Sequence, residues 1–498
     1  MKIEILNSNF KRNNYLKIVT IIIMEKVRHP NIEKYFAVGI LVSVVPVEEM
    51  EAQRNQERPN IILILTDDQG WCDVGFNGSR DILTPNIDNL ARQGVVFTCG
   101  YVSHPYSSPS RAGIMTGKYQ QRFGHEYNVP YEPDNDKMGT PTDEVFIAQL
   151  LKKTGYRTCA IGKWHLGDNE KFLPHHRGFD HWFGFSAGGM NYWGIPQNEG
   201  GRLKVRRNDE LVEAKDITYL TDDFTKETLW FIKENKDSPF FIYLAYNAPH
   251  APNQTTQHYL EKTSHIEYGE RSVYGAMVSA VDEGVGRIDS MLTLLGIRSN
   301  TLIVFLSDNG GRVESADNRP YRGHKGMLFE GGIRVPFCMS WPEQIPPDMR
   351  YDKPVISLDL FATFLSAANI TPNKELDLDG VNLLPFIRGE NKEAPHNILY
   401  WRVAGGEEYA IRKGDFKLVK SAYKNKTFLF NLKVDEMEIN DISSENPELF
   451  AEMGKLYQEW NNKLVMPLWT DPHLDNVKKE QKALLDARTK SMSRTENK

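Results

Sequence analysis

The feature that most constrains the fold of this chain of 498 residues is a set of short, continuous apolar runs rich in β-branched side chains. The first run, residues 61–65, reads Ile-Ile-Leu-Ile-Leu, and similar runs occupy residues 156–161, 240–245 and 302–306. A strand that is apolar at every position is typical of a parallel sheet covered on both faces. We therefore expect four buried parallel strands in these places.

Helical patterns separate the predicted strands. Residues 142–153 begin with a threonine cap and acidic residues, and then place Phe146, Leu150 and Leu151 at helical spacing. Residues 272–295 repeat the helical period over a longer stretch. Strands that alternate with helices indicate an α/β fold with a doubly wound, mostly parallel sheet.

The pattern changes near residue 395. Short strands of alternating polarity are predicted at residues 398–401, 409–412, 416–420 and 427–431, and an amphipathic helix at 447–464. We therefore predict four regions. They are a targeting segment (1–52), a catalytic domain (53–394), a smaller C-terminal α+β subdomain with an antiparallel sheet and a helix (395–470), and a charged tail (471–498).

Composition excludes some functions. The chain has 60 basic and 66 acidic residues, so no overall basic field attracts nucleic acid, and an anionic substrate needs a local cluster of cations. Four cysteines (Cys72, Cys99, Cys159 and Cys338) are scattered without a Cys-x-x-Cys pair, which argues against a zinc site and a disulfide-stapled scaffold. We expect buried thiols.

The N-terminal region resembles an export signal if translation starts at Met24. Basic residues then precede the apolar run 35–47, and Ala52 is a small residue suited to cleavage. Neither apolar run before residue 52 is long enough to span a bilayer comfortably, so we expect no stable membrane span. We predict an exported protein, periplasmic or secreted; a disordered or interfacial arm is the alternative.

Polar residues follow each predicted parallel strand at once. In an open α/β sheet the ligand crevice lies beyond the carboxyl ends of the strands, so these side chains should converge. The residues concerned are Asp67 and Asp68, then Lys163 and His165, then His250, and finally Asp308 and Asn309. The acidic pairs and the asparagine offer oxygen donors only, which favours Ca²⁺ over softer metals.

Cations gather in the same segments. Arg111, Lys163 and Lys325, with His165 and His250, form a group suited to hold a tetrahedral sulfate or phosphate beside a divalent cation.

A further motif runs from Ser107 to Gly117 and reads Ser-Ser-Pro-Ser-Arg-Ala-Gly-Ile-Met-Thr-Gly. It resembles the maturation signature of type I sulfatases, in which the first residue is oxidised to formylglycine (3-oxoalanine). Met115 and Lys118 replace the usual leucine and arginine. The segments at residues 65–70, 162–167, 249–252, 307–311 and 323–332 also occur in the sulfatase order, so the resemblance covers about residues 59–464. It implies an alkaline-phosphatase-like fold.

The resemblance also implies roles for single residues. Asp67, Asp68, Asp308 and Asn309 would bind one Ca²⁺ together with the modified Ser107. Arg111 and Lys163 would hold the formylglycine hydrate, with His165 assisting, and His250 and Lys325 would contact the sulfate and the leaving oxygen. One hydroxyl of the hydrate attacks sulfur, and the other expels sulfate and regenerates the aldehyde. Lys325 and His250 are equal candidates for the general acid. We expect Pro109 and Ser110 to open a helix that faces the sulfate.

The substrate is less determined. Tyr192 and Trp193 could stack on a sugar ring or pack in the core. Arg322 and His324 in the lysine loop are further candidates for substrate contacts, and Arg319, His175 and His176 could bind anionic groups or be surface charges. The resemblance is closest to bacterial enzymes with serine-type signatures, which are matured by a radical-type partner enzyme. We expect an exo-acting sulfatase that releases sulfate from a sulfated sugar or oligosaccharide of algal or host glycans.

Two alternatives remain open. A phosphomonoesterase or phosphodiesterase of the same superfamily would use unmodified Ser107 and additional histidine and aspartate ligands. A glycan-binding pseudoenzyme would keep the fold without catalysis, although no expected catalytic position is missing.

Overall fold

The computed structural model describes residues 58–195, 203–422 and 424–471 in full, together with the backbone of three strands nearer the N-terminus. The chain divides into two compact units, Met1–Arg58 and Pro59–Lys498. In the first unit β1 (Lys2–Leu6), β2 (Leu16–His29) and β3 (Ile32–Pro46) form an antiparallel sheet. Ala52 and nearly all of the predicted tail lie outside the described residues. Among the helices that the structure describes, none has the length and apolar character needed to cross a membrane.

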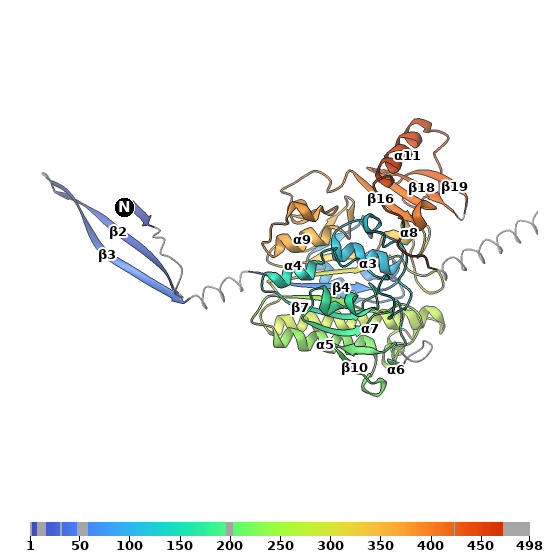
Figure 1. Ribbon diagram of the computed structural model, residues 1–498, viewed down its shortest axis with the longest axis horizontal. Helices are drawn as coiled ribbons and strands as arrows, with labels where there is room; N and C mark the ends of the chain where they lie inside the picture. Colours follow the sequence, from blue (N-terminus) through green and yellow to red (C-terminus); the bar gives the residue numbers. More distant parts are fainter. Residues whose placement is uncertain are drawn as a thin grey trace, which may run out of the picture. The chain divides into compact units, whose positions relative to one another are not determined.

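A ten-stranded sheet forms the centre of the second unit (Figure 1). Its five middle strands, in the order β8-β7-β11-β4-β12, are mutually parallel, and the outer strands add antiparallel pairs on both sides. From edge to edge the strands are β10 (Glu210–Val212), β9 (Val205–Arg207), β8 (His181–Phe185), β7 (Arg157–Lys163), β11 (Phe240–Ala245), β4 (Asn60–Thr66), β12 (Thr301–Ser307), β13 (Phe337–Ser340), β5 (Val95–Phe97) and β14 (Met349–Tyr351). The four predicted strands are confirmed as β4, β7, β11 and β12.

Helices cover both faces of this sheet, as Figure 1 shows. Ile62 and Ile64 of β4 pack with the helices of one face, whereas Ile61, Leu63 and Leu65 pack with those of the other. This two-sided burial explains the unbroken apolar runs and confirms the doubly wound α/β fold. One face carries α2 (Pro85–Arg92), α5 (Leu220–Glu234) and α7 (Glu270–Leu294), and the other carries α3 (Ser107–Thr116), α4 (Ile147–Lys153) and α9 (Asp359–Ala367).

The predicted helix 142–153 begins five residues later than expected, at Ile147. Residues 142–144 form a turn after Pro141, and Glu144 is paired with Lys118 at 2.9 Å. The amide of Phe146 instead donates to the side chain of Gln149, which caps α4. The acidic residues therefore belong to the preceding turn and not to the first turn of the helix.

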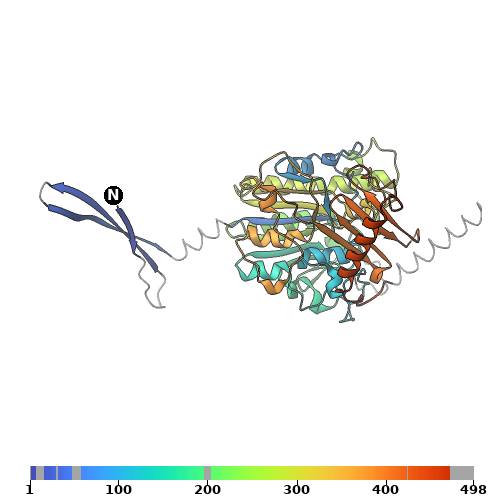
Figure 2. The ribbon, with the colours of Figure 1, turned by 90° about the horizontal axis from the view of Figure 1, so that it is seen from above.

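The C-terminal region contains the predicted antiparallel sheet, and Figure 2 shows it (orange to red) from above. Its strands are β16 (Ile398–Val403), β17 (Glu408–Lys413), β18 (Phe416–Ser421) and β19 (Lys426–Asn431). Helix α11 (Pro447–Asn461) packs on it through Met453 and Tyr457, and ends three residues before the predicted position. A buried ion pair of 2.7 Å between Arg402 and Glu126 joins this sheet to the larger part.

Short elements complete the described fold. They are β6 (Gly100–Tyr101), β15 (Val355–Ile356), α6 (Gln257–Lys262), α8 (Glu330–Ile333), α10 (Leu384–Ile387), and the 3₁₀ turns η3 (Glu170–Phe172) and η4 (Pro174–Arg177). All four cysteines are free thiols; Cys159 and Cys338 are buried, whereas Cys72 and Cys99 are only partly so. The expectation of four buried thiols is therefore correct for two of them.

Candidate active site

The register of the parallel strands brings the predicted site residues to one edge of the sheet. Ala245 at the end of β11 lies opposite both Gly162 of β7 and Leu65 of β4, and Ser307 of β12 lies opposite Thr66. The residues that end or follow these strands therefore emerge side by side. The predicted convergence of the strand ends is confirmed.

Helix α3 supplies the serine and the arginine. It begins at Ser107, two residues earlier than the expected start at Pro109, and it ends at Thr116, followed by Gly117, whose φ of 67° suits glycine. Arg111 follows one turn after Ser107, so both side chains lie on the same face of the helix. That face is directed at the ends of β4 and β12, because Arg111 pairs with Asp308.

Ser107 lies between two oxygen acceptors. Its Oγ is 3.2 Å from Oδ1 of Asp67 and 3.2 Å from Oδ1 of Asn309. A hydroxyl carries one proton and can donate to only one of them. At least one of the two Oδ1 atoms therefore receives no proton from Ser107. An oxygen acceptor that lacks a donor in this way suits a bound cation.

Arg111 and Lys163 each pair with a carboxylate of the site, Asp308 and Asp67 respectively. The guanidinium nitrogens of Arg111 lie 3.0 and 2.7 Å from Oδ2 of Asp308, and Nζ of Lys163 lies 2.7 Å from Oδ2 of Asp67. Each of these four side chains is fully buried. Charged groups removed from water in this way need close partners, and the site provides them.

Asp68 organises the second half of the site. Its Oδ2 is 2.8 Å from Nζ of Lys325 and 3.6 Å from Nε2 of His250, and its Oδ1 accepts from the side-chain Nδ2 of Asn309 at 2.8 Å. Asp68 has a φ of 63°, in the left-handed region that costs energy for a non-glycine residue. The fold thus holds this carboxylate in a strained backbone conformation at the site.

The three carboxylates have divergent pKa values. Burial raises the pKa of Asp67 to about 7, although Lys163 opposes this shift. Burial also acts to raise the pKa values of Asp68 and Asp308, but nearby cations, chiefly Lys325 and Arg111 respectively, outweigh it; the pKa of Asp68 is held well below its usual range and that of Asp308 is lowered. Such divergence is common at functional sites, and structural ion-pair networks also produce it, so the geometry of the site has to carry the assignment.

The histidines and lysines of the site also differ in protonation state. Burial lowers the pKa of His250 to about 3 and, together with Lys163, holds that of His165 well below its usual range, so both imidazoles are neutral at neutral pH. Burial lowers the pKa of Lys163, whereas Asp68 overcomes burial and raises that of Lys325. Lys325 is therefore a firmly charged group within the site.

The donor set fits a hard divalent cation. Asp67, Asp68, Asp308 and Asn309 offer oxygen atoms only, and all four are buried side chains at the ends of β4 and β12. Hard oxygen ligands with three carboxylates suit Ca²⁺ or Mg²⁺. The Oδ1 atoms that compete for the one proton of Ser107 mark where such a cation would lie.

Several supporting residues escaped the sequence reasoning. Tyr243 on β11 contacts Arg111 through its hydroxyl (3.4 Å). The hydroxyl of Ser108 lies 2.6 Å from Nε2 of buried His125 and donates to the carbonyl of His165 at 2.7 Å. In the sequence, only the position of Ser108 next to Ser107 indicated a role in the site. A single histidine such as His125 gives no such indication.

The four candidates for substrate contacts are placed differently. Tyr192 is fully buried, and its hydroxyl oxygen lies 2.7 Å from the carbonyl oxygen of Asn247 and 2.9 Å from that of His250, so it supports the site and offers no face to a sugar. Trp193 packs edge-on against Tyr219. Arg322 donates to the carbonyl of Glu438 and lies over the ring of Phe329 at 4.0 Å.

His324 is the candidate best placed for a ligand. It is only partly buried, and with Arg319 and Arg271 it lines an open cavity of about 510 Å³ beside the Lys325 loop. Arg319 is largely exposed and paired with Asp317 at 2.6 Å. His175 and His176 lie away from this cavity, in η4.

Together, the parallel sheet with its strand-end carboxylates and the helix that begins at Ser107 define an alkaline-phosphatase-like enzyme. The chain matches the family model described as Sulfatase over residues 59–370. It therefore belongs to the sulfatase family and is a sulfuric ester hydrolase. The model described as N-sulphoglucosamine sulphohydrolase, C-terminal, matches residues 323–464.

Individual relatives agree with this assignment. The chain is 35% identical to mouse (Mus musculus) N-acetylgalactosamine-6-sulfatase over 76% of its own length and 74% of that protein. It is 30% identical to the uncharacterized sulfatase YdeN of Escherichia coli (strain K12), with 86% and 90% coverage. The crystal structure of Ps i-CgsB in complex with k-i-k-neocarrahexaose matches with a TM-score of 0.78 and 38% identity, covering 86% of this chain and 98% of that one.

Proposed function

We propose that this enzyme removes sulfate from a sulfated carbohydrate, with Ser107 converted to formylglycine and one Ca²⁺ held beside it. The observation that carries the proposal is the position of Ser107. Ser107 is the first residue of helix α3, and its Oγ lies 3.2 Å from Oδ1 of both Asp67 and Asn309. Arg111 pairs with Asp308 and Lys163 with Asp67 in the same site. A serine in this setting suits oxidation to a group that reacts beside a bound cation.

Asp67, Asp68, Asp308 and Asn309, together with residue 107, would hold the calcium ion. When bound, Ca²⁺ stabilises negative charge on the sulfate oxygens as a Lewis acid. Arg111 and Lys163 orient the reacting group of residue 107, and His165, whose buried Nδ1 has no hydrogen-bond partner among the described residues, assists them.

The geometry favours Lys325 over His250 as the general acid. Nδ1 of His250 lies 2.6 Å from the carbonyl of Ala251, an acceptor only, so Nδ1 carries the proton. Because the pKa of His250 is lowered to about 3, the imidazole is neutral and its Nε2, which faces Asp68, has no proton to give. Lys325 keeps its proton and can transfer it to the leaving oxygen.

Two observations support a carbohydrate substrate. The Ps i-CgsB structure, at 38% identity, contains a neocarrahexaose oligosaccharide, and the mouse relative is an N-acetylgalactosamine-6-sulfatase. The open cavity that contains His324 has a lining of mixed charge, because Arg271 and Arg319 are paired there with Asp81 and Asp317. We propose a sulfated galactan oligosaccharide as the substrate.

The remaining parts of the proposal concern the whole chain. Residues 53–394 form the catalytic domain, residues 395–470 form a subdomain that closes one side of the site, and residues 471–498 form a tail. The 1–52 segment directs export to the periplasm or the medium. A radical-type maturation enzyme oxidises Ser107 before the enzyme becomes active.

One experiment tests the chemistry at Ser107. Mass spectrometry of the peptide that contains residue 107, after expression with a maturation enzyme, should show a loss of about 2 Da. Sulfate release from a panel of sulfated galactan oligosaccharides should accompany this loss, and Ser107→Ala should abolish release while the protein stays folded. A variant that releases sulfate at the parent rate would overturn the proposal. Equal activity on phosphate monoesters by unmodified protein would instead favour the phosphatase alternative.

A further inference from the structure

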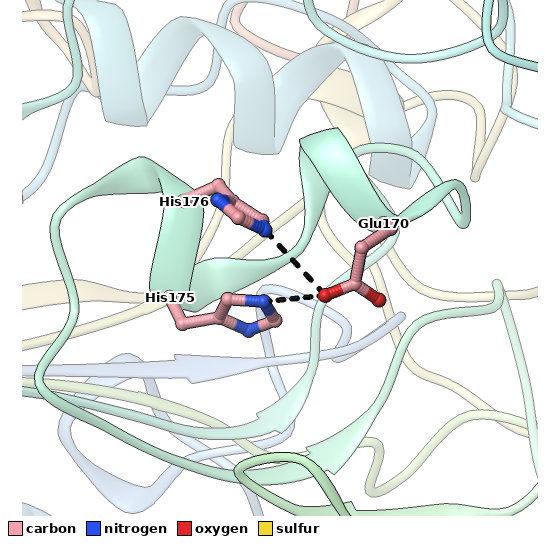
Figure 3. A group of neighbouring side chains, drawn as sticks. All are labelled: Glu170, His175 and His176. Atoms are coloured by element: carbon pink, nitrogen blue, oxygen red, sulfur yellow. Dashed lines mark hydrogen bonds and ion pairs between the residues drawn. The ribbon is translucent and has the colours of Figure 1, made fainter.

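A second group of potential metal ligands lies outside the site described above. Glu170, His175 and His176 bring three ligand atoms within 4.8 Å of one another. Figure 3 shows that both imidazole rings are directed at the same carboxylate. Nε2 of His175 is 2.7 Å and Nε2 of His176 is 3.4 Å from Oε1 of Glu170, and Oδ1 of Asp209 lies 4.0 Å from Nε2 of His175.

This arrangement differs from the other histidine–carboxylate contacts of the described residues. His181, His258 and His396 each meet one carboxylate with a single imidazole, and a single imidazole, that of His250, also faces Asp68 in the active site. A single pair is explained by an ordinary hydrogen bond. Two imidazoles that share one carboxylate oxygen, with a second carboxylate nearby, make a mixed nitrogen and oxygen donor set.

The chemistry of this set selects a transition metal. Two imidazole nitrogens and carboxylate oxygens suit Zn²⁺, which binds such ligands at about 2.0–2.1 Å in tetrahedral geometry, so that neighbouring ligand atoms lie about 3.3 Å apart. The two His–Glu distances, 2.7 and 3.4 Å, bracket that value. Calcium, which prefers six or more oxygens, suits the first site but not this one.

The backbone holds the donors before any metal arrives. Glu170 belongs to η3 and both histidines belong to η4, which starts at Pro174. The amide of Leu173 donates to the carbonyl of Glu170, and the amide of His176 donates to that of Leu173. Buried Phe172 and Leu173 anchor the turns, so the metal would cross-link a segment that is already ordered.

The segment is also connected to the catalytic strand end. The carbonyl of Phe172 accepts from the indole of Trp164 at 2.9 Å, and Trp164 lies between Lys163 and His165. Arg177, the last residue of η4, donates to the carbonyl of Thr140 at 2.8 Å. A metal held by η3 and η4 would therefore brace the loop that follows β7.

We propose that Glu170, His175 and His176 form a second, surface metal site for Zn²⁺ or a similar transition-metal ion, with Asp209 as an additional ligand. Within the described residues, Nδ1 of His175 has no hydrogen-bond partner, so the outer hydrogen bond that usually orients a ligating imidazole is missing there. We therefore expect a dissociation constant on the order of micromolar rather than nanomolar. The site does not depend on the proposed sulfatase chemistry.

The test is a calorimetric Zn²⁺ titration of the full-length protein in saturating Ca²⁺, with Co²⁺ absorbance as a reporter of nitrogen ligation. We expect one Zn²⁺ equivalent that disappears in a His175→Ala/His176→Ala double variant and weakens at least about tenfold in Glu170→Gln. His258→Ala is the matched control, because His258 is an exposed histidine that meets one carboxylate; it should bind as the parent does.

Thermal unfolding gives an independent readout. Zn²⁺ should raise the Tm of the parent protein and of His258→Ala, but not that of the double variant. Unchanged stoichiometry and affinity in a folded double variant, or in Glu170→Gln, would overturn the proposal. Because Glu170 is largely exposed, Glu170→Gln should fold as the parent does. Its Zn²⁺ affinity therefore tests the proposal even if the double variant does not fold.

Discussion

Two clusters of buried charge contact the segment 101–107, one through Tyr101 and the other through Ser107, and their charges are used differently. The active-site cluster contains Asp67, Asp68 and Asp308 with Arg111, Lys163 and Lys325. The second, which we call the junction cluster, contains Glu330 and Glu438 with Lys417, Arg334, Arg412 and Tyr101, and it joins α8 to the C-terminal sheet.

The difference lies in how the oxygens are used. In the junction cluster, Glu330 accepts from Tyr101 at 2.6 Å and from Lys417 at 2.7 Å, and Glu438 accepts from the amide of Glu330. In the active-site cluster, by contrast, two oxygens compete for the one proton of Ser107. Charged groups whose hydrogen-bonding partners all lie within the cluster stabilise the fold, whereas oxygens that lack a donor can bind a ligand.

The largest effect should come from removing one active-site carboxylate. We expect Asp67→Asn to lower kcat/KM for sulfate release about a thousandfold, because it weakens cation binding and releases Lys163 from its partner. Its Tm should fall as well, because buried Lys163 loses its ion-pair partner, so rates are compared per folded molecule. Initial rates and thermal unfolding check both parts. A rate within tenfold of the parent would contradict the assignment of Asp67.

Removing the central cation of the junction cluster should act on stability instead. Lys417→Met leaves Glu330 and Glu438 buried without their shared partner, and we expect a loss of about 3–5 kcal/mol in the free energy of unfolding. Activity per folded molecule should be unchanged. Lys413→Met is the control, because Lys413 is part-exposed and its pair with Glu452 should contribute no more than about 1 kcal/mol. Urea unfolding measures both; equal losses would remove the contrast.

Chelation should distinguish the clusters without mutation. We expect a Ca²⁺ chelator to lower the rate of sulfate release at least about tenfold and added Ca²⁺ to restore it. Lys417→Met should respond in the same proportion as the parent, because the junction cluster holds no part of the proposed calcium set. A rate that is insensitive to prolonged chelation would argue against a required calcium.

The smallest expected effect concerns pH. Burial raises the pKa of Glu438 to about 7, above its ordinary value of 4.5. A carboxyl group with a raised folded-state pKa binds more protons when folded, so its contribution to stability is complete below about pH 4.5 and is lost as the pH rises to about 7. Glu438→Gln should flatten this part of the Tm–pH curve. An unchanged slope between pH 5 and 7 would show that another group titrates there.

The sequence was most informative where a physical pattern is local. The run at residues 61–65 predicts β4 because every side chain of that strand is buried, and the polar residues directly after it predict the site because strand ends meet at one edge. The start of α4 was misplaced because Glu144 pairs with Lys118, a partner that cannot be seen in the local sequence.

The features that the sequence did not predict depend on contacts between residues far apart in the chain. Nothing near Glu330 indicates that Lys417 will be its partner, because the pairing depends on how the C-terminal sheet docks. Tyr192 lies in an aromatic, glycine-rich stretch suited to sugar stacking, yet its ring is buried and stacks on Tyr219. Burial of a single aromatic residue is set by tertiary packing, to which local composition is only a weak guide.

Strand β4 lies in the centre of the sheet but is synthesised long before the strands that pair with it. Both of its neighbours are made much later, since β11 begins at Phe240 and β12 at Thr301. At about 5–20 residues per second, the apolar strand waits roughly ten seconds to half a minute for its first partner. During that interval the sheet that buries Ser107 to 2% exposure is incomplete, so the proposed maturation enzyme would have access to the serine. The order of translation thus favours modification before folding is complete.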